Sequence, residues 1–219
     1  MLCIQKRHQE GSGIPVHTAV IILGNAVWIP QGEEFIGADR GALIAAKNNI
    51  RMKAAIGDFD SVTDEEFALI SEWADEVIRL NPIKDDTDSE AAVRFALERG
   101  YDHILLCSEL SGRADHTVVN LRLIGQMPGI LELCDSQNHV SAYQVGRHLI
   151  PKGDMKYISL FAEEACVTFE QVSYPLHERQ LTYRDLYTVS NEIVGKEGIL
   201  TVHEGTVLVI QSNDIKKTS

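Results

Sequence analysis

Acidic residues stand at the points where several short apolar runs of this chain end. Two aspartates one residue apart, Asp58 and Asp60, follow a strand-like run and Gly57 in the segment AIGDFDSV. The segments KDDTDSE and SGRADH follow later apolar runs. Ligands of an open α/β sheet collect at the carboxyl ends of its strands. Five carboxylates are therefore expected to converge on one crevice: Asp39, Asp58, Asp60, Asp88 and Asp115.

Such a cluster needs a cation. Two carboxylates about 4 Å apart repel by roughly 4 kcal/mol at an effective dielectric constant of ~20. Oxygen ligands without a Cys or His partner suit a hard ion, and Mg²⁺ is the usual one where carboxylates meet phosphates. Arg113, beside the first amides of a helix, offers an anion-binding counterpart, and Lys84 adds a further positive charge. This combination favours Mg²⁺-dependent phosphoryl chemistry.

Each acidic residue also has a purely local interpretation. Asp88 and Asp115 lie in the first turns of predicted helices, where the helix dipole stabilises a carboxylate without any function. Asp39 could serve only as an N-cap, and the Asp58/Asp60 pair alone is a weak metal signal. Neither GxSxG nor GxxxxGK[ST] occurs, so a serine nucleophile and a Walker loop find no support.

Strands and helices alternate in the first half of the chain. Periodicity and capping signals predict strands at 17–24, 52–58, 75–80 and 102–108, and helices at 39–50, 63–75, 87–100 and 112–126. This order predicts a parallel sheet covered by helices. After 127–129 the pattern changes to short strand candidates: ILELCD, HVSAYQVG, MKYISLFA, ACVTFEQV, DLYTVSN, GILTVHEG and TVLVIQS. Such a series is typical of an antiparallel sandwich or barrel.

Composition narrows the possible partners. The chain has 219 residues, of which 44% are hydrophobic, enough for a substantial core. Its formal charge of -12 argues against nucleic acid and anionic membranes as partners. No apolar run reaches membrane-spanning length, the first residues lack the apolar centre of a secretion signal, and the four cysteines form no CxxC pair. We therefore expect a cytoplasmic protein with reduced thiols.

Four segments together carry a family resemblance. GADRG, GDFDSV, KDDTDSEAA and SGRADHTVVNL occur in an order and spacing that resemble thiamine pyrophosphokinases (thiamine diphosphokinases) of the bacterial type. The similarity continues through DSQNHV, YISLF, YPL, VSNEI and EGTVLVIQS, from about Thr18 onward. The resemblance implies an α/β fold in which a Rossmann-like, ATP-binding catalytic domain (18–127) precedes an antiparallel β-sandwich that binds thiamine (130–213).

The resemblance also implies an activity and residue roles. A pyrophosphoryl group passes from ATP to the hydroxyethyl oxygen of thiamine, with Mg²⁺, giving thiamine diphosphate and AMP. The implied catalytic residues are Asp58, Asp60, Asp88, Arg113 and Asp115, with Asp58, Asp60 and Asp88 as metal ligands. Asp39, Gly57, Lys84, Thr87 and Arg113 would contact ATP, while Ser190 and Asn191 would contact thiamine from the partner subunit of a homodimer. Position alone leaves Asp58 and Asp88 both open as the general base.

Two departures from the family pattern keep alternatives open. The glycine-rich stretch expected before GRxDH reads SELSG here (108–112), and the first seventeen residues have no counterpart in the family. A Mg²⁺-dependent phosphohydrolase that uses the Asp58/Asp60 pair as nucleophile and acid is one rival. A non-catalytic sensor of thiamine or nucleotide is the other.

Overall fold

The computed structural model describes residues 16–32, 34–81 and 87–214. The chain divides into two compact units, each considered by itself. Of the described residues, the α/β unit comprises 16–114 and 134–136, and the β-rich unit comprises 115–133 and 137–214. Both parallel and antiparallel strands are present, so the protein is a mixed α/β structure.

The α/β unit is built on five parallel strands. They are β1 (Thr18–Ile22), β2 (Phe35–Ala38), β3 (Ala54–Gly57), β4 (Val77–Arg79) and β5 (His103–Cys107). β1 pairs with both β5 and β2, β2 pairs with β3, and β3 pairs with β4. The central strands are apolar and buried along most of their length, as expected for strands covered on both faces.

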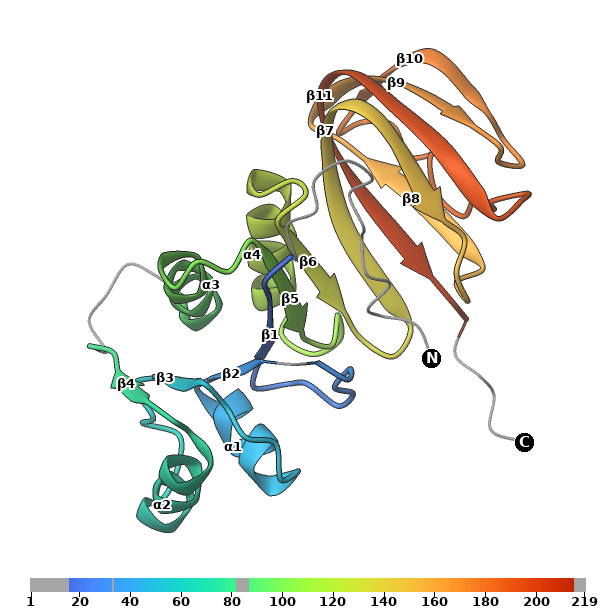
Figure 1. Cartoon of the computed structure of the whole chain (residues 1–219). Helices are drawn as coiled ribbons and strands as arrows, with labels where there is room; N and C mark the ends of the chain where they lie inside the picture. Colours follow the sequence, from blue (N-terminus) through green and yellow to red (C-terminus); the bar gives the residue numbers. More distant parts are fainter. Residues whose placement is uncertain (1–15, 33, 82–86, 215–219) are drawn as a thin grey trace, which may run out of the picture. The chain divides into compact units, whose positions relative to one another are not determined.

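Helices connect these strands and cover the sheet. They are α1 (Arg40–Lys47), α2 (Asp64–Trp73) and α3 (Asp88–Glu98), and Figure 1 shows α3 on the opposite side of β2 and β3 from α1. Thr63 and Glu66 form the predicted capping box, in which each residue's backbone N–H donates to the other's side chain at 3.3 Å. A Cβ at Gly41 would overlap the carbonyl oxygen of Ile22, so this glycine lets α1 touch the end of β1.

The β-rich unit opens with α4 (Ala114–Gln126), most of which belongs to it, and continues in strands. These are β6 (Leu131–Cys134), β7 (Asn138–Pro151), β8 (Tyr157–Phe161), β9 (Glu164–Glu170), β10 (Leu176–Thr182) and β11 (Glu197–Ser212). β11 pairs antiparallel with β7, β8 and β9, and β9 with β10. The register of β11 shifts between Val202 and Thr206, where Gly205 has φ 79°. β11 pairs with β7 on both sides of this shift, with β9 as far as Gly205, and with β8 from Leu208 onward.

Several predicted strands differ from the observed ones. β2 and β10 were not predicted, because one is a four-residue FIGA run and the other reads LHERQLT, with mostly exposed polar side chains. DLYTVSN was predicted as a strand, which is wrong, since only an isolated bridge between Asn191 and Ile158 forms there. GILTVHEG and TVLVIQS form one long strand, β11, instead of two.

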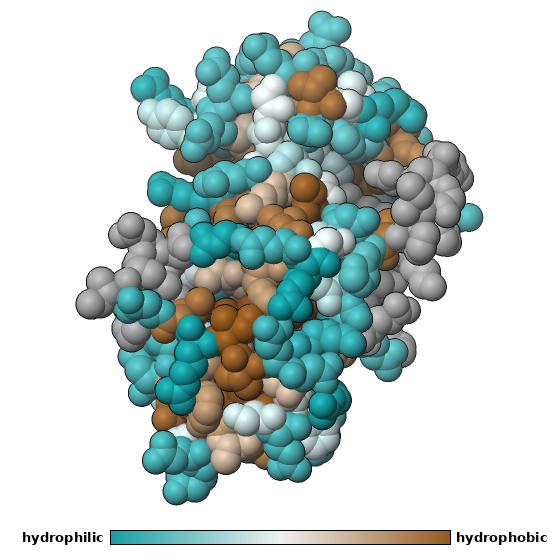
Figure 2. All heavy atoms as spheres, turned by 60° about the vertical axis from the view of Figure 1, so that its left-hand side comes forward, coloured by the Kyte–Doolittle hydropathy of each residue, from teal (hydrophilic) through white to brown (hydrophobic). Residues whose placement is uncertain are grey.

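On the face shown in Figure 2, hydrophilic side chains are interspersed with apolar areas, and no single apolar region covers that face. None of the helices in the described ranges combines the length and the apolar character that a bilayer crossing requires.

Candidate metal and phosphate site

Asp39 is held in an unusual conformation between β2 and α1. Its φ of 48° and ψ of -121° are rare for a residue with a side chain. It occupies the N-cap position of α1, but its carboxylate makes no capping hydrogen bond to that helix. The Ser61 hydroxyl donates to Oδ2 at 3.4 Å, whereas Oδ1 is buried and has no hydrogen-bond partner among the described residues. Asp39 is therefore an N-cap by position only.

Two further carboxylates lie close to Asp39. Burial raises the pKa of Asp39 above its ordinary value, and the negative charges of Asp88 and Asp58 raise it further. The three side chains come from different elements, since Asp58 follows β3 and Asp88 opens α3. The structure thus brings together three of the five predicted carboxylates.

Gly57 permits the close approach between β3 and Asp39. The backbone N–H of Asp39 donates to the carbonyl oxygen of Ile56 at 2.7 Å. A Cβ on Gly57 would lie 2.9 Å from Cα of Asp39 and 3.1 Å from its nitrogen. A larger residue at position 57 would push Asp39 away, so this glycine is needed by the backbone of the site.

Asp58 and Asp60 have different environments. Asp58 is half-buried and its Oδ1 accepts the backbone N–H of Asp60 at 3.1 Å, while Asp60 is exposed. Phe59 between them has φ 58° and is buried, with its ring 5.4 Å from that of Phe67. The loop therefore turns Phe59 into the core and keeps Asp58 close to Asp39. Sequence reasoning missed Phe59, whose only signal was an aromatic residue inside an acidic turn.

Asp88 begins α3 directly after Thr87. The Thr87 hydroxyl oxygen accepts the backbone N–H of Glu90 at 3.2 Å, so Thr87 caps the helix. The first turn of α3 thereby has a fixed position, with Asp88 at the positive end of the helix dipole. Asp88 is thus stabilised by the helix dipole and also lies near Asp39. The two observations are compatible, because a carboxylate at the start of a helix can also face a ligand.

The remaining predicted residues are distributed between the units. Arg113 immediately precedes α4 in the α/β unit, whereas Asp115 is counted with the β-rich unit. Lys84 lies outside the described residues.

Ser190 and Asn191 lie in the β-rich unit and differ in availability. Ser190 is exposed, has φ 57°, and its backbone N–H donates to the Ser159 hydroxyl at 3.1 Å. The side chain of Asn191 is engaged by the backbone: Oδ1 accepts from Tyr174 at 3.0 Å, and Nδ2 donates to the Tyr174 carbonyl at 2.8 Å. Asn191 thus supports the local chain, and Ser190 is the freer of the two to meet a ligand.

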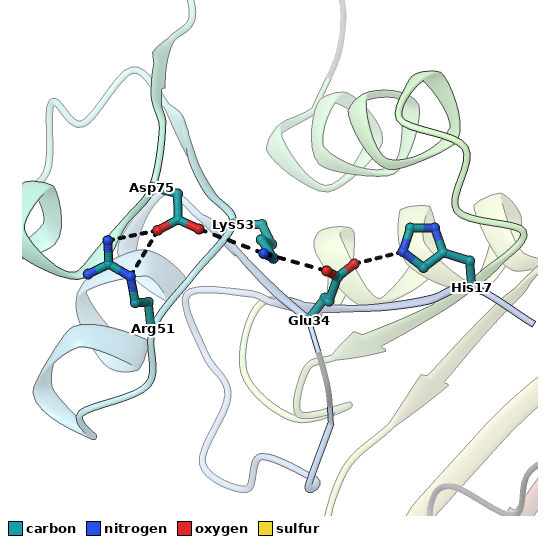
Figure 3. A network of polar contacts seen from close by, with 5 residues as sticks. All are labelled: His17, Glu34, Arg51, Lys53 and Asp75. Carbon is teal, nitrogen blue, oxygen red and sulfur yellow. Dashed lines mark hydrogen bonds and ion pairs between the residues drawn. The ribbon is translucent and has the colours of Figure 1, made fainter.

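The amino ends of the parallel strands in the α/β unit carry a different pattern of charge from their carboxyl ends. Here basic side chains and carboxylates alternate, from His17 through Glu34, Lys53 and Asp75 to Arg51 (Figure 3). His17 Nε2 lies 2.8 Å from Glu34, Lys53 lies 3.6 Å from Glu34 and 3.9 Å from Asp75, and Arg51 lies 2.7 Å from Asp75. Each carboxylate in this network faces at least two basic side chains.

Family models match both halves of the chain. Residues 29–130 match Thiamin pyrophosphokinase, catalytic domain, and residues 147–207 match Thiamin pyrophosphokinase, vitamin B1 binding domain. A thiamine pyrophosphokinase of Bacillus subtilis (strain 168) is 33% identical over 187 residues, which cover 82% of this chain and 87% of that protein. The chain belongs to the thiamine pyrophosphokinase family. It is thereby a member of a family of transferases.

Solved structures of this family have a similar fold. A thiamin pyrophosphokinase family protein from Enterococcus faecalis superposes with a TM-score of 0.82 at 27% identity, covering 91% of this chain and all 100% of that one. Thiamine pyrophosphokinase from Bacillus subtilis gives a TM-score of 0.81 at 29% identity, covering 90% and 100%. The mixed sheet is therefore the fold of the thiamine pyrophosphokinase family.

The carboxylates of this family member fit a hard cation. Asp39 Oδ1 is buried and has no hydrogen-bond partner among the described residues, and burial and the charges of Asp88 and Asp58 raise the pKa of this carboxyl group, so a cation bound nearby would favour its ionised form. Within the described ranges no three ligating side chains already enclose one point as a metal shell would. Mg²⁺ commonly takes only one or two carboxylates and completes its shell with water and substrate phosphates, which matches an open set of this kind.

Proposed function

We propose that this enzyme transfers a pyrophosphoryl group from ATP to the hydroxyethyl oxygen of thiamine, giving thiamine diphosphate and AMP. The observation that carries the proposal is the group of three carboxylates at the carboxyl edge of the parallel sheet, where Asp39 Oδ1 is buried and finds no hydrogen-bond partner in the described part of the chain. Membership of the thiamine pyrophosphokinase family supports the substrate assignment.

The acidic residues would hold Mg²⁺, which when bound neutralises phosphate oxygens and orients the donor. Asp58 and Asp88, the predicted ligands that lie near Asp39, are the direct ligands in this proposal. Asp60, exposed and attached to Asp58 through its backbone, lies at the rim of the site. Arg113, Lys84 and Thr87 bind phosphate oxygens, and Asp115 completes the acidic set.

Proton removal and thiamine binding complete the assignment. Asp58 or Asp88 takes the proton of the attacking hydroxyl group. Ser190, supported by Asn191, contacts thiamine from the partner subunit of a homodimer. Attack in line on the β-phosphorus then depends mainly on positioning, because the reacting groups need little covalent help from the protein.

The domain assignment is part of the proposal. We infer a Rossmann-like catalytic domain at 18–127 and a thiamine-binding β-sandwich at 130–213, and the family matches at 29–130 and 147–207 support two functional parts in this order. The homodimer and a cytoplasmic location go with this assignment. Light scattering coupled to gel filtration measures the dimer directly, and a monomeric mass at working concentration would contradict it.

One assay separates this function from its rivals. The protein is incubated with ATP, Mg²⁺ and thiamine, and AMP and thiamine diphosphate are quantified by chromatography. We expect both products in equal amounts, and AMP only when thiamine is present. Inorganic phosphate release with a covalent aspartyl phosphate would instead indicate the phosphohydrolase. Tight thiamine binding without turnover would indicate the sensor.

A further inference from the structure

The strand order of the α/β unit reverses between β1 and β5. From β1 the chain proceeds through β2 and β3 to β4 in one direction, and β5 then pairs on the other side of β1. In open α/β sheets ligands bind beyond the carboxyl ends of the strands at such a reversal. The loops that follow β1 and β5 therefore flank the expected position of the nucleotide.

A side chain bridges these two loops. Asn25, in the loop after β1, donates from Nδ2 to the Glu109 carbonyl oxygen at 2.8 Å. The Ser108 hydroxyl donates to Asn25 Oδ1 at 2.9 Å. Ser108 is 4% exposed, and its hydroxyl also lies 3.4 Å from the Glu109 carbonyl oxygen, so without Asn25 this buried hydroxyl would keep only the longer contact. We call Asn25, Ser108 and Glu109 the Asn25 brace.

Neighbouring groups hold the brace in place. The Glu109 carboxylate faces the backbone N–H groups of Val27 and Trp28, further along the loop after β1. The backbone N–H of Leu110 donates to Asp135 Oδ2 at 3.2 Å, and Asp135 is 5% exposed. Burial raises the pKa of Glu109, and the charge of Asp135 raises it further. Both loops are thus fixed by polar side chains at the reversal point.

We propose that Asn25 is a positioning residue for the nucleotide. By bridging the loops after β1 and β5, the Asn25 brace fixes the width of the crevice that receives ATP, and it raises nucleotide affinity without contributing to the chemical step. Loops that are already ordered lose less conformational entropy when a ligand binds. The inference rests on the proposed function for the identity of the nucleotide. Because the brace lies in the α/β unit, we expect its loss to weaken the binding of ATP and not that of thiamine.

Steady-state kinetics test this role through the split between KM and kcat. Asn25→Ala is expected to raise KM for ATP about tenfold, the order of effect of losing a hydrogen-bonded pair. KM for thiamine and kcat stay within about twofold. Asn48→Ala is the matched control, because Asn48 Nδ2 also donates to a backbone carbonyl, that of Ile44, at 2.8 Å. Equal kinetics of the two variants would overturn the proposal, as would a parallel rise of both KM values with a lowered Tm.

A double-mutant cycle checks that the residues act together. Ser108→Ala removes only the hydroxyl and leaves the bond from Asn25 to the Glu109 carbonyl oxygen, so a rise in KM for ATP of about threefold is expected. Adding Ser108→Ala to Asn25→Ala should then cost nothing more, since the shared contact is already lost. Fully additive effects would show that the two residues act separately and would contradict a brace.

Nucleotide binding alone separates this proposal from the proposed function. The chain has two tryptophans, so Trp73→Phe leaves Trp28 as a reporter on the braced loop. A non-hydrolysable ATP analogue is titrated with Mg²⁺ and without thiamine, and calorimetry checks the fluorescence. Asn25→Ala in this background should weaken the Kd about tenfold, and Asn48→Ala should not. If no thiamine diphosphate forms but analogue binding still depends on Asn25, the proposed function fails and the brace stands. No analogue binding, or binding indifferent to Asn25, overturns the brace.

Discussion

The two edges of the parallel sheet in the α/β unit use charge in opposite ways. At the amino edge, Glu34 accepts hydrogen bonds from Tyr101 and faces His17 and Lys53, and these contacts hold the pKa of Glu34 below its ordinary value. At the carboxyl edge, Asp39 is buried near two other aspartates and its pKa is raised. Carboxylates at the amino edge face basic side chains, whereas Asp39 Oδ1 at the carboxyl edge is buried without a hydrogen-bond partner among the described residues.

Backbone geometry differs between the edges in the same sense. Asp39 and Phe59, at the carboxyl edge, have positive φ values of 48° and 58°. At the amino edge, Asn49 before β3 has φ 56°, in the left-handed region that asparagine adopts more readily than a bulky residue such as Phe59. Strain and unpaired charge cost stability and persist where function requires them. This difference favours the carboxyl edge as the working edge, in line with the proposed function, and the amino edge as the stabilising one.

The largest expected effect distinguishes the edges by activity. Asp58→Asn should lower kcat/KM about a thousandfold, because it removes a proposed metal ligand from the acidic group. Asp75→Asn is the control from the amino edge, and it should leave kcat/KM within about threefold while losing part of a surface ion pair. Rates of thiamine diphosphate formation measure both. A comparable loss of activity in Asp75→Asn would remove the contrast between the edges.

The rim and the arginine of the site come next in size. Asp60→Asn and Arg113→Ala should each lower kcat/KM by at least about a hundredfold, the scale of losing one electrostatic stabiliser. Arg51→Ala, which removes an exposed cation from the amino edge, serves as control and should remain close to wild type. Near-normal turnover of either folded test variant would exclude that residue from the site.

Replacement of Gly57, which lies against the backbone of Asp39, should have an intermediate effect. Gly57→Ala should lower activity about tenfold and destabilise the protein by about 1–3 kcal/mol, because the new methyl group collides with Asp39. Gly125→Ala is the matched control, since a Cβ at this position in α4 meets nothing within 4 Å. Denaturant unfolding and the product assay measure both variants. Unchanged activity and unfolding free energy in Gly57→Ala would show that the loop can relax around the methyl group, and would contradict the need for glycine at this position.

The smallest effect is a difference in the sign of pH dependence. In the metal-free protein, the pKa of Asp39 is higher in the folded state than in the unfolded state. Ionised Asp39 therefore destabilises the fold at a pH above the folded-state pKa, and this destabilisation disappears as the pH falls to the unfolded-state pKa. Asp39→Asn should therefore raise Tm at pH 7, by about 2 °C or more, and have no effect in acid.

Glu34→Gln should show the opposite sign. The pKa of Glu34 is lower in the folded state than in the unfolded state. Ionised Glu34 therefore stabilises the fold at a pH above the unfolded-state pKa, and this contribution is lost as the pH falls through the folded-state pKa. The variant should lower Tm at pH 7 and approach wild type in acid. Thermal unfolding in chelator from pH 7 to acid compares the two, and shifts of the same sign would contradict the proposed difference between the edges.

Particular residues show how far sequence reasoning reaches. The apolar runs and the capping threonines, Thr63 and Thr87, predicted α2 and α3 and the strands before them, because both signals are local. β2 and β10 escaped detection, because FIGA is short and LHERQLT is polar along most of its length. Their strand pairing is a tertiary property.

By itself, the sequence determined the alternation of elements, the candidate carboxylates and the family to which the chain belongs, since residue types, spacing and local capping are written in the order of amino acids. Only the tertiary structure decided which of these carboxylates share one environment. Asp39, Asp58 and Asp88 come from segments up to 49 residues apart in the sequence. Strand pairing and the close approach at Gly57 bring them together, and burial, followed by the charges of Asp88 and Asp58, raises the pKa of Asp39. The bridge from Asn25 to Ser108 and Glu109 likewise exists only because β1 and β5 pair side by side.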